Sequence, residues 1–124
     1  MMKILVAVVL AGFSTLAAAQ NWVALLKNTA AERFNEDDLQ MFLAAGRKAL
    51  TQAKDNETVR WENPDTRARG ELTVLRSFDW ESHACKELRL YNEAGGRRDT
   101  STLKLCSVDG RWRLLAPSQY KKAS

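Results

Sequence analysis

The sequence has 124 residues, 45% of them hydrophobic and 27% charged, a balance typical of a folded globular protein. It carries 19 Lys and Arg against 15 Asp and Glu, two cysteines and a single histidine. This length leaves room for one compact domain and excludes a second, and one histidine leaves the Ser/His/Asp and Cys/His catalytic arrangements little to build on.

The first 19 residues have the pattern of a secretory signal peptide. Lys3 supplies a positive start, an apolar run follows, and Ala17 and Ala19 form an A-x-A cleavage site. The apolar run is shorter than the roughly 20 residues that a membrane-spanning helix needs, although an uncleaved N-terminal anchor is the alternative. We expect cleavage before Gln20 and export to the periplasm or beyond. The mature chain, 20–124, would then be a single domain of 105 residues (124 − 19) with no transmembrane segment.

The positive net charge bears on the choice of partner. In an exported chain it points away from nucleic acid and toward anionic polymers of the cell envelope or another envelope protein, although plain solubility is the simpler and preferred explanation. The sequence has no phosphate-binding loop and no dinucleotide fingerprint. It therefore predicts no cofactor.

An amphipathic helix is predicted from about Glu36 to Ala53. Asn35 suits the N-cap, Asp38 stands three residues later as in a capping box, and the acidic first turn complements the helix dipole. The segment Asn21 to Ala31 fits either a short helix or a stretch that docks on the core. Apolar positions at helical spacing define the expected core face of the main helix, namely Leu39, Phe42, Leu43, Gly46, Leu50 and Ala53.

Strand-like segments separated by turn signals follow the helix. They are Thr58–Glu62, Glu71–Phe78, two strands on either side of Gly95-Gly96, and Trp112–Leu115 after the turn signal Asp109-Gly110. One helix followed by about four to five strands in meander order predicts an α+β fold, with the helix packed on an antiparallel sheet. The polar, basic tail 118–124 is expected to be mobile.

The two cysteines predict one disulfide, Cys85–Cys106. In an oxidising compartment a pair of cysteines in a small domain is most simply a bridge. If Gly95-Gly96 is a two-residue hairpin turn, paired positions sum to 191, and so do 85 and 106. The cysteines then occupy a non-hydrogen-bonded pair, whose Cα separation of about 4.5 Å lies within reach of a disulfide. Because side chains alternate along a strand, Cys85 lies on the other face of the sheet from Leu88 and Leu90. We therefore expect the bridge on the more solvent-exposed face.

Two stretches give the chain a resemblance to a known family. Trp61-Glu62-Asn63-Pro64-Asp65-Thr66 with Gly70 resembles the W-x-N-P-x-T…G entry of the 17 kDa bacterial surface-antigen family. The cysteine hairpin followed by Asp109-Gly110-Arg111-Trp112 resembles the second half of that domain. The resemblance covers 58–115 and implies an envelope-associated domain without established catalysis. The chain lacks the lipoprotein cysteine and the glycine-zipper segment of many members, and Arg67 stands where a glycine is expected in the first turn.

Binding is the function that the sequence favours. Trp61 and Trp112 are expected to fill the small core, whereas Trp80 is expected in an exposed loop. Arginines in the two predicted turns could form a basic rim, and solvated turns without a partner are an equal alternative. The candidate contact surface is therefore Arg67, Arg69, Arg97 and Arg98, together with Trp80.

Two other functions stay open. A small hydrolase could use Asp79, Glu81 or His83, since carboxylates at strand spacing can converge on one face. A metal site at His83 would require Cys85 to be a free thiolate, so no metal is predicted. An inhibitor or chaperone of another exported protein could insert the hairpin tip into a cleft. The preferred interpretation is a non-catalytic envelope binding or assembly module.

Overall fold

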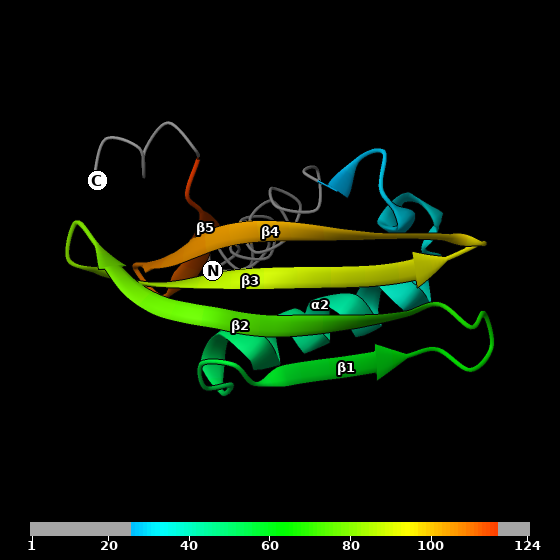
Figure 1. Ribbon diagram of the computed structural model, residues 1–124, viewed down its shortest axis with the longest axis horizontal. Helices are drawn as coiled ribbons and strands as arrows, with labels where there is room; N and C mark the ends of the chain where they lie inside the picture. Colours follow the sequence, from blue (N-terminus) through cyan, green and yellow to red (C-terminus); the bar gives the residue numbers. More distant parts are fainter. Residues whose placement is uncertain (1–25, 117–124) are drawn as a thin grey trace, which may run out of the picture.

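One helix packs against one face of a five-stranded antiparallel sheet (Figure 1), which confirms the predicted α+β fold. The computed structural model describes residues 26–116. The predicted signal peptide 1–19 and tail 118–124 lie outside this range. The strands follow one another in the order β1-β2-β3-β4-β5, as in a meander. Their bounds are β1 (Thr58–Glu62), β2 (Arg69–Trp80), β3 (His83–Ala94), β4 (Arg97–Val108) and β5 (Arg111–Leu114). Among the described residues, no helix is long and apolar enough to cross a membrane.

The helix, α2 (Glu36–Thr51), begins where the sequence predicts, and its capping box is present. The Asn35 side chain accepts a hydrogen bond from the amide N–H of Asp38 at 2.8 Å, and Asp38 accepts one from the amide N–H of Asn35 at 2.9 Å. These two bonds satisfy N–H groups that the first turn of a helix leaves without partners.

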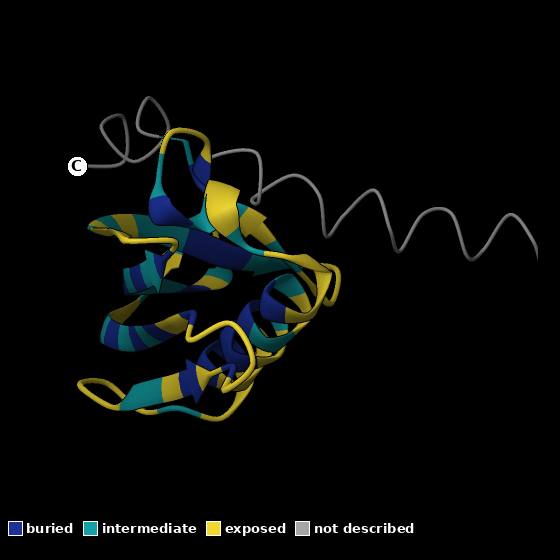
Figure 2. Cartoon of the chain, turned by 90° about the vertical axis from the view of Figure 1, so that its right-hand side faces the viewer, coloured by how far each residue is buried: buried dark blue, intermediate teal, exposed yellow. Residues whose placement is uncertain are grey.

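Phe42, Gly46 and Leu50 are buried as predicted, but the buried face of α2 is rotated toward the side that carries Ala45 and Ala49. Its buried apolar positions centre on Phe42, Ala45 and Ala49, whereas Leu39 and Leu43 lie half-buried at the flank. Alanines at the contact let the helix axis lie close to the sheet, and the larger leucines then fill the space beside it. Figure 2 shows the buried residues gathered where α2 faces the strands.

A short 3₁₀ helix, η2 (Ala30–Arg33), precedes α2. Leu26 and Ala30 are buried, so the part of the Asn21–Ala31 segment that the structure describes does dock on the core. Phe34 follows η2, and its ring meets that of Trp61 edge-on at 5.1 Å between centroids. Trp61 is only 6% exposed and lies in the main core, as predicted, while Trp112 is half-buried against it.

Three two-residue turns join β2 to β5. Both residues of each turn have positive φ angles, as the turns that fit strand twist require. The residues are Glu81 and Ser82, Gly95 and Gly96, and Asp109 and Gly110. The last two turns are predicted from their glycines, whereas Glu81-Ser82 carries no such signal. As a result β2 runs to Trp80, which belongs to a strand and not to the predicted loop.

The predicted hairpin register is confirmed. Cys85 pairs with Cys106 across β3 and β4, the two are bonded, and their Cα atoms lie 4.0 Å apart. The register also pairs Leu88 with Leu103, Glu87 with Lys104 and Ala94 with Arg97. The spacing of the cysteines about Gly95-Gly96 is thus explained by strand pairing.

The disulfide lies on the face of the sheet away from α2, as predicted, but it is buried and not exposed to solvent. Cys85 and Cys106 are only 2% and 3% exposed and form a second, smaller cluster with Leu115. The cause is a bulge in β2: Val74 pairs with Leu88 but Arg76 pairs with Glu87, which leaves Leu75 unpaired. An extra residue reverses the facing of every later side chain in the strand. Phe78 and Trp80 therefore turn to the outer face and cover the bridge.

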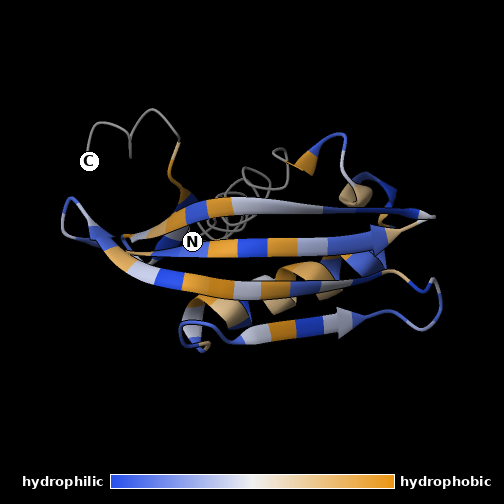
Figure 3. Ribbon diagram, viewed as in Figure 1, coloured by the Kyte–Doolittle hydropathy of each residue, from blue (hydrophilic) through white to orange (hydrophobic). Residues whose placement is uncertain are grey.

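Within residues 26–116, no helix covers the outer face of the sheet, which apart from the disulfide cluster is mostly polar. Figure 3 shows hydrophobic and hydrophilic residues alternating along β3, as expected for a sheet with one covered face. Opposite charges face one another across this outer surface. The ion pairs are Arg60–Glu71, Arg69–Glu93, Arg76–Glu87 and Lys104–Glu87.

Candidate functional site: a basic groove at the tip of the sheet

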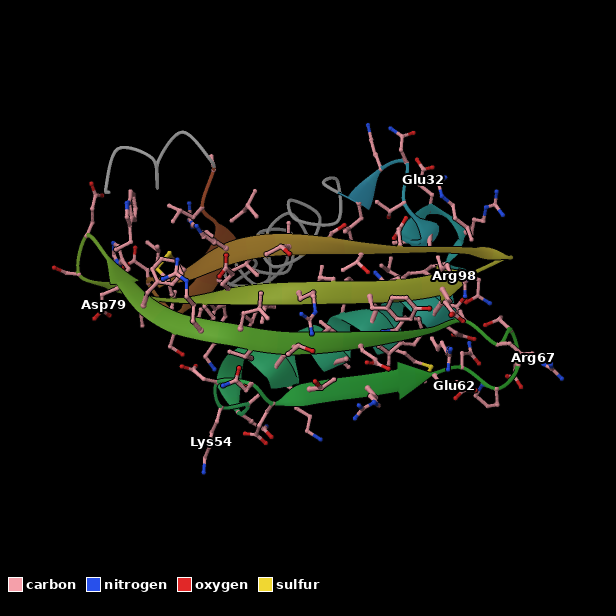
Figure 4. The ribbon with its side chains drawn as sticks, in the orientation of Figure 1. Glu32, Lys54, Glu62, Arg67, Asp79 and Arg98 are labelled. Carbon is pink, nitrogen blue, oxygen red and sulfur yellow. A yellow bond between two sulfur atoms is a disulfide. The ribbon has the colours of Figure 1, made fainter. Side chains whose placement is uncertain are left out.

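A hollow of about 420 Å³ lies between the β1–β2 loop and the β3–β4 turn. We call it the tip groove. Three of the four arginines predicted from the sequence line it, and Figure 4 shows Arg67 and Arg98 at the same end of the sheet. The lining residues are Thr66, Arg67, Glu93, Ala94, Gly95, Gly96, Arg97 and Arg98. Residues from two turns that are distant in the sequence therefore meet at one surface.

The β1–β2 loop is anchored to the helix by a buried carboxylate. Asp38 is 1% exposed, and one of its oxygens accepts hydrogen bonds from the side chains of Asn63 at 2.8 Å and Thr66 at 2.7 Å. The backbone of the loop closes on itself, because the N–H of Arg67 bonds to the carbonyl of Asn63 at 2.7 Å. The asparagine and threonine of the N-P-x-T motif thus hold the loop in place here.

Asp38 stays ionised although it is buried. Burial by itself raises the pKa of this carboxyl. Hydrogen bonds from Thr66, the Asn35 amide and Asn63 outweigh that effect and hold the pKa below its usual range. A charged group at the first turn of α2 is further favoured by the helix dipole. The loop that carries Arg67 is therefore fixed to an ionised residue.

Arg67 has a backbone conformation that favours glycine. Its φ is +67°, which explains why a glycine is expected at this point of the turn. A side chain in this region costs about 1 kcal/mol. The side chain is exposed, and no carboxylate of the described residues pairs with it. The strained position thus carries a cation that is open to a ligand.

The β3–β4 turn is held by the segment before α2. Arg33 donates to the carbonyl of Gly95, and Arg97 donates to the carbonyl of Asn28. Asp99 accepts a 2.8 Å bond from the amide of Ala30 and lies 3.9 Å from the Arg97 guanidinium. Arg97 therefore helps to hold the wall of the groove, and of the three arginines its side chain is the one already bonded to neighbouring groups.

Arg69 is neutralised by Glu93 and does not line the groove. Its Nε and Nη2 donate to the two carboxylate oxygens of Glu93 at 2.8 Å and 3.2 Å, and the Tyr91 hydroxyl donates to the same carboxylate. The bonds from Arg69 and Tyr91 lower the pKa of Glu93 to about 2, and the bond to Glu93 raises the pKa of Tyr91. Arg98 faces Glu93 across the β3–β4 pairing and its charge also favours the Glu93 carboxylate, but no ion pair within the described residues holds its side chain as Glu93 holds that of Arg69.

Trp80 lies too far from the tip groove to share a site with it. It ends β2 beside the first residue of β3, whereas the groove lies at the other end of β3. Twelve residues of strand span about 36 Å. Trp80 is also half-buried against the disulfide cluster instead of exposed. The structure thus separates the predicted rim into a basic groove and a distant apolar cluster.

The residues of the alternative catalytic site are not brought together. His83 pairs with Trp80, and Asp79 pairs with Ala84, so successive side chains place Asp79 and His83 on opposite faces of the sheet. Glu81 lies in the exposed turn between them. Cys85 is in the disulfide and offers His83 no thiolate. Within residues 26–116, no group of three or more His, Cys, Asp or Glu side chains could hold a metal ion.

The chain matches no family model, no curated protein and no solved structure. The resemblance to the surface-antigen family stays a prediction from the motif residues. Sequence reasoning missed Asp38 as the anchor of the first loop and Glu93 as the partner of Arg69. The capping-box position of Asp38 was visible in the sequence, but its contacts with Asn63 and Thr66 form only in the folded chain.

Proposed function

We propose that the protein is a non-catalytic binding or assembly module of the cell envelope, exported by its first 19 residues, and that the tip groove is its contact surface. The observation that supports this most strongly is the meeting of Arg67 and Arg98 at one hollow, from loops that are distant in the sequence. Both loops are held in place, one by Asp38 and the other by Arg33 and Arg97. Because the backbone that carries both arginines is already held, ligand binding has to order their side chains but not the loops.

The ligand chemistry that fits is anionic. Guanidinium groups bind carboxylates and phosphates through paired N–H donors, and Arg67 and Arg98 present two such groups on exposed side chains. Glu93, the acid that lines the groove, is occupied by Arg69 and Tyr91 and so repels an anion less. Phosphate-rich or carboxylate-rich envelope polymers are the ligand class that we favour.

The test is binding of purified lipopolysaccharide to the mature chain at low and high salt. We expect affinity to fall as salt rises, since exposed charges are screened. The double variant Arg67→Gln, Arg98→Gln should bind about tenfold more weakly, a loss of about 1.4 kcal/mol.

A matched control removes the same charge at the other end of the sheet. Arg111 and Arg113 are exposed on β5, so Arg111→Gln with Arg113→Gln changes net charge equally without touching the groove. The control should bind as the wild type does. Equal loss in both double variants would show that net charge and not the groove is responsible, and binding that ignores salt would contradict the proposal.

A further inference from the structure

Half of β4 has an open edge. The strand has 12 residues, but β5 has only four and pairs with Leu105 to Val108 (Figure 1). One further bond, from the amide of Leu115 to the carbonyl of Lys104 at 2.8 Å, extends this pairing. From Arg98 to Leu103, no strand among the described residues lies beside β4 on this side.

The register shows which backbone groups point outward. Ala94 and Arg97 close a two-residue turn and so form a hydrogen-bonded pair, after which bonded and non-bonded pairs alternate. Arg98, Thr100 and Thr102 therefore direct their N–H and C=O groups away from β3. The bond that Lys104 accepts from Leu115 has the same parity, which confirms the assignment.

The reason that β5 stops is its own sequence. Paired positions of β4 and β5 sum to 219, so the next outward residue, Thr102, would face position 117. That residue is Pro117, which has no N–H to donate to the carbonyl of Thr102. Among the described residues, the segment before α2 packs near β4 and bonds to it through the side chains of Arg97 and Asp99, but no backbone hydrogen bond joins the two as a strand would.

We propose that an extended segment of another polypeptide adds to this edge as a sixth strand, antiparallel to β4 and opposite Arg98 to Leu103. Strand addition to an open edge uses backbone hydrogen bonds for affinity and alternate side chains for specificity. The exposed Arg98 favours an acidic side chain opposite it, and Thr100 and Thr102 favour β-branched ones. This inference goes beyond the proposed function, because it needs no ligand in the tip groove.

A second copy of this chain fits the edge poorly. Two β4 strands paired about Ser101 would set Arg98 against Lys104 of the other copy, and like charges directly opposite are destabilising. Pairing about Thr100 would carry the turn Gly95-Gly96 to the position that Leu115 occupies beside Lys104. The edge therefore suits a short segment without a bulky turn at its end.

The experiment is amide hydrogen exchange by NMR on the mature, oxidised chain. The probe is the synthetic peptide Ac-Val-Thr-Val-Thr-Ser-Glu-NH2, whose glutamate falls opposite Arg98, and the control peptide has lysine in place of glutamate. With millimolar probe, we expect exchange at Arg98, Thr100 and Thr102 to slow about tenfold. The amides of Ser101 and Leu103 point to β3 and should not change. The lysine peptide should bind about tenfold more weakly.

A variant tests the same edge independently. Thr100→Pro removes one outward N–H without breaking a bond to β3, and it should weaken probe binding about tenfold. Thr100→Val keeps the N–H and should bind as the wild type does. No slowing at millimolar probe, or equal slowing at Ser101, would overturn the proposal. So would protection of these amides that depends on protein concentration alone, since the occupant would then be a second copy.

Discussion

The side-chain amide of Asn63 donates a 2.8 Å hydrogen bond to the carboxylate of Asp38, and this bond joins the β1–β2 loop to the first turn of α2. The same carboxylate accepts the capping-box hydrogen bond from the amide of Asn35 and a further hydrogen bond from the hydroxyl of Thr66. One buried carboxylate thus sets both the start of the helix and the loop that presents Arg67.

Replacing that carboxylate should destabilise the protein. Asp38→Ala removes part of the helix cap and leaves the donors of Asn63 and Thr66 without their acceptor, so the free energy of unfolding should fall by about 3 kcal/mol. Urea denaturation measures the change. The control is Asp37→Ala, since Asp37 is an exposed acid in the same turn and should cost less than about 1 kcal/mol. Equal losses in the two variants would contradict the buried network.

The free energy of unfolding should depend on pH through the same residue, Asp38. The folded pKa of Asp38 lies below its usual value, so its contribution is complete above about pH 4 and is lost as pH falls through the folded pKa. Glu93, with a pKa of about 2, acts in the same direction at lower pH. Unfolding free energies of the wild type and Asp38→Asn, measured between neutral pH and pH 2, should converge as pH falls. Parallel curves would show that Asp38 does not titrate with folding.

Gly70 should not tolerate a side chain. A Cβ at this position would lie 2.4 Å from Nε1 of Trp61, 2.5 Å from Oδ1 of Asn92 and 2.8 Å from the carbonyl of Tyr91. We expect Gly70→Ala to lower the free energy of unfolding by about 2 kcal/mol. Thermal and urea unfolding measure it. In a Trp61→Phe background, where the indole nitrogen is absent, the same substitution should cost less. An undiminished cost there would place the clash at the Asn92 side chain and the Tyr91 carbonyl instead of at the indole.

The disulfide should account for a large share of the stability. Replacing Cys85 and Cys106 together by alanine should lower the free energy of unfolding by about 3 kcal/mol, the chain-entropy value for a loop of this size. Reduction of the wild type should produce a similar loss.

Intact mass and free-thiol titration on the exported protein complete this test. A mass that starts at Gln20 and is two hydrogens light, with no reactive thiol, is the expected result. Two reactive thiols in folded protein would contradict the bridge, and a mass that includes residues 1–19 would contradict cleavage.

Local patterns were enough to predict the elements that depend on neighbours in the sequence. The helix start follows from Asn35 and Asp38, because capping bonds span only three residues. The hairpin register follows from Gly95-Gly96, because a two-residue turn leaves no freedom in pairing. The same register predicts the disulfide, and the turn signals predict where the groove arginines lie.

Only the tertiary structure decided the features that depend on distant residues. The bulge at Leu75 turns Phe78 and Trp80 over the disulfide, and no local signal marks it, since it is selected by packing on both faces. Glu93 neutralises Arg69 from a neighbouring strand, which removes one predicted cation. The edge of β4 is open where β5 ends, and Pro117 accounts for that end only once the pairing of β4 with β5 is known. The sequence alone determined which residues carry charge and where strands turn, whereas which charges stay free is a property of side chains that meet only when the chain is folded.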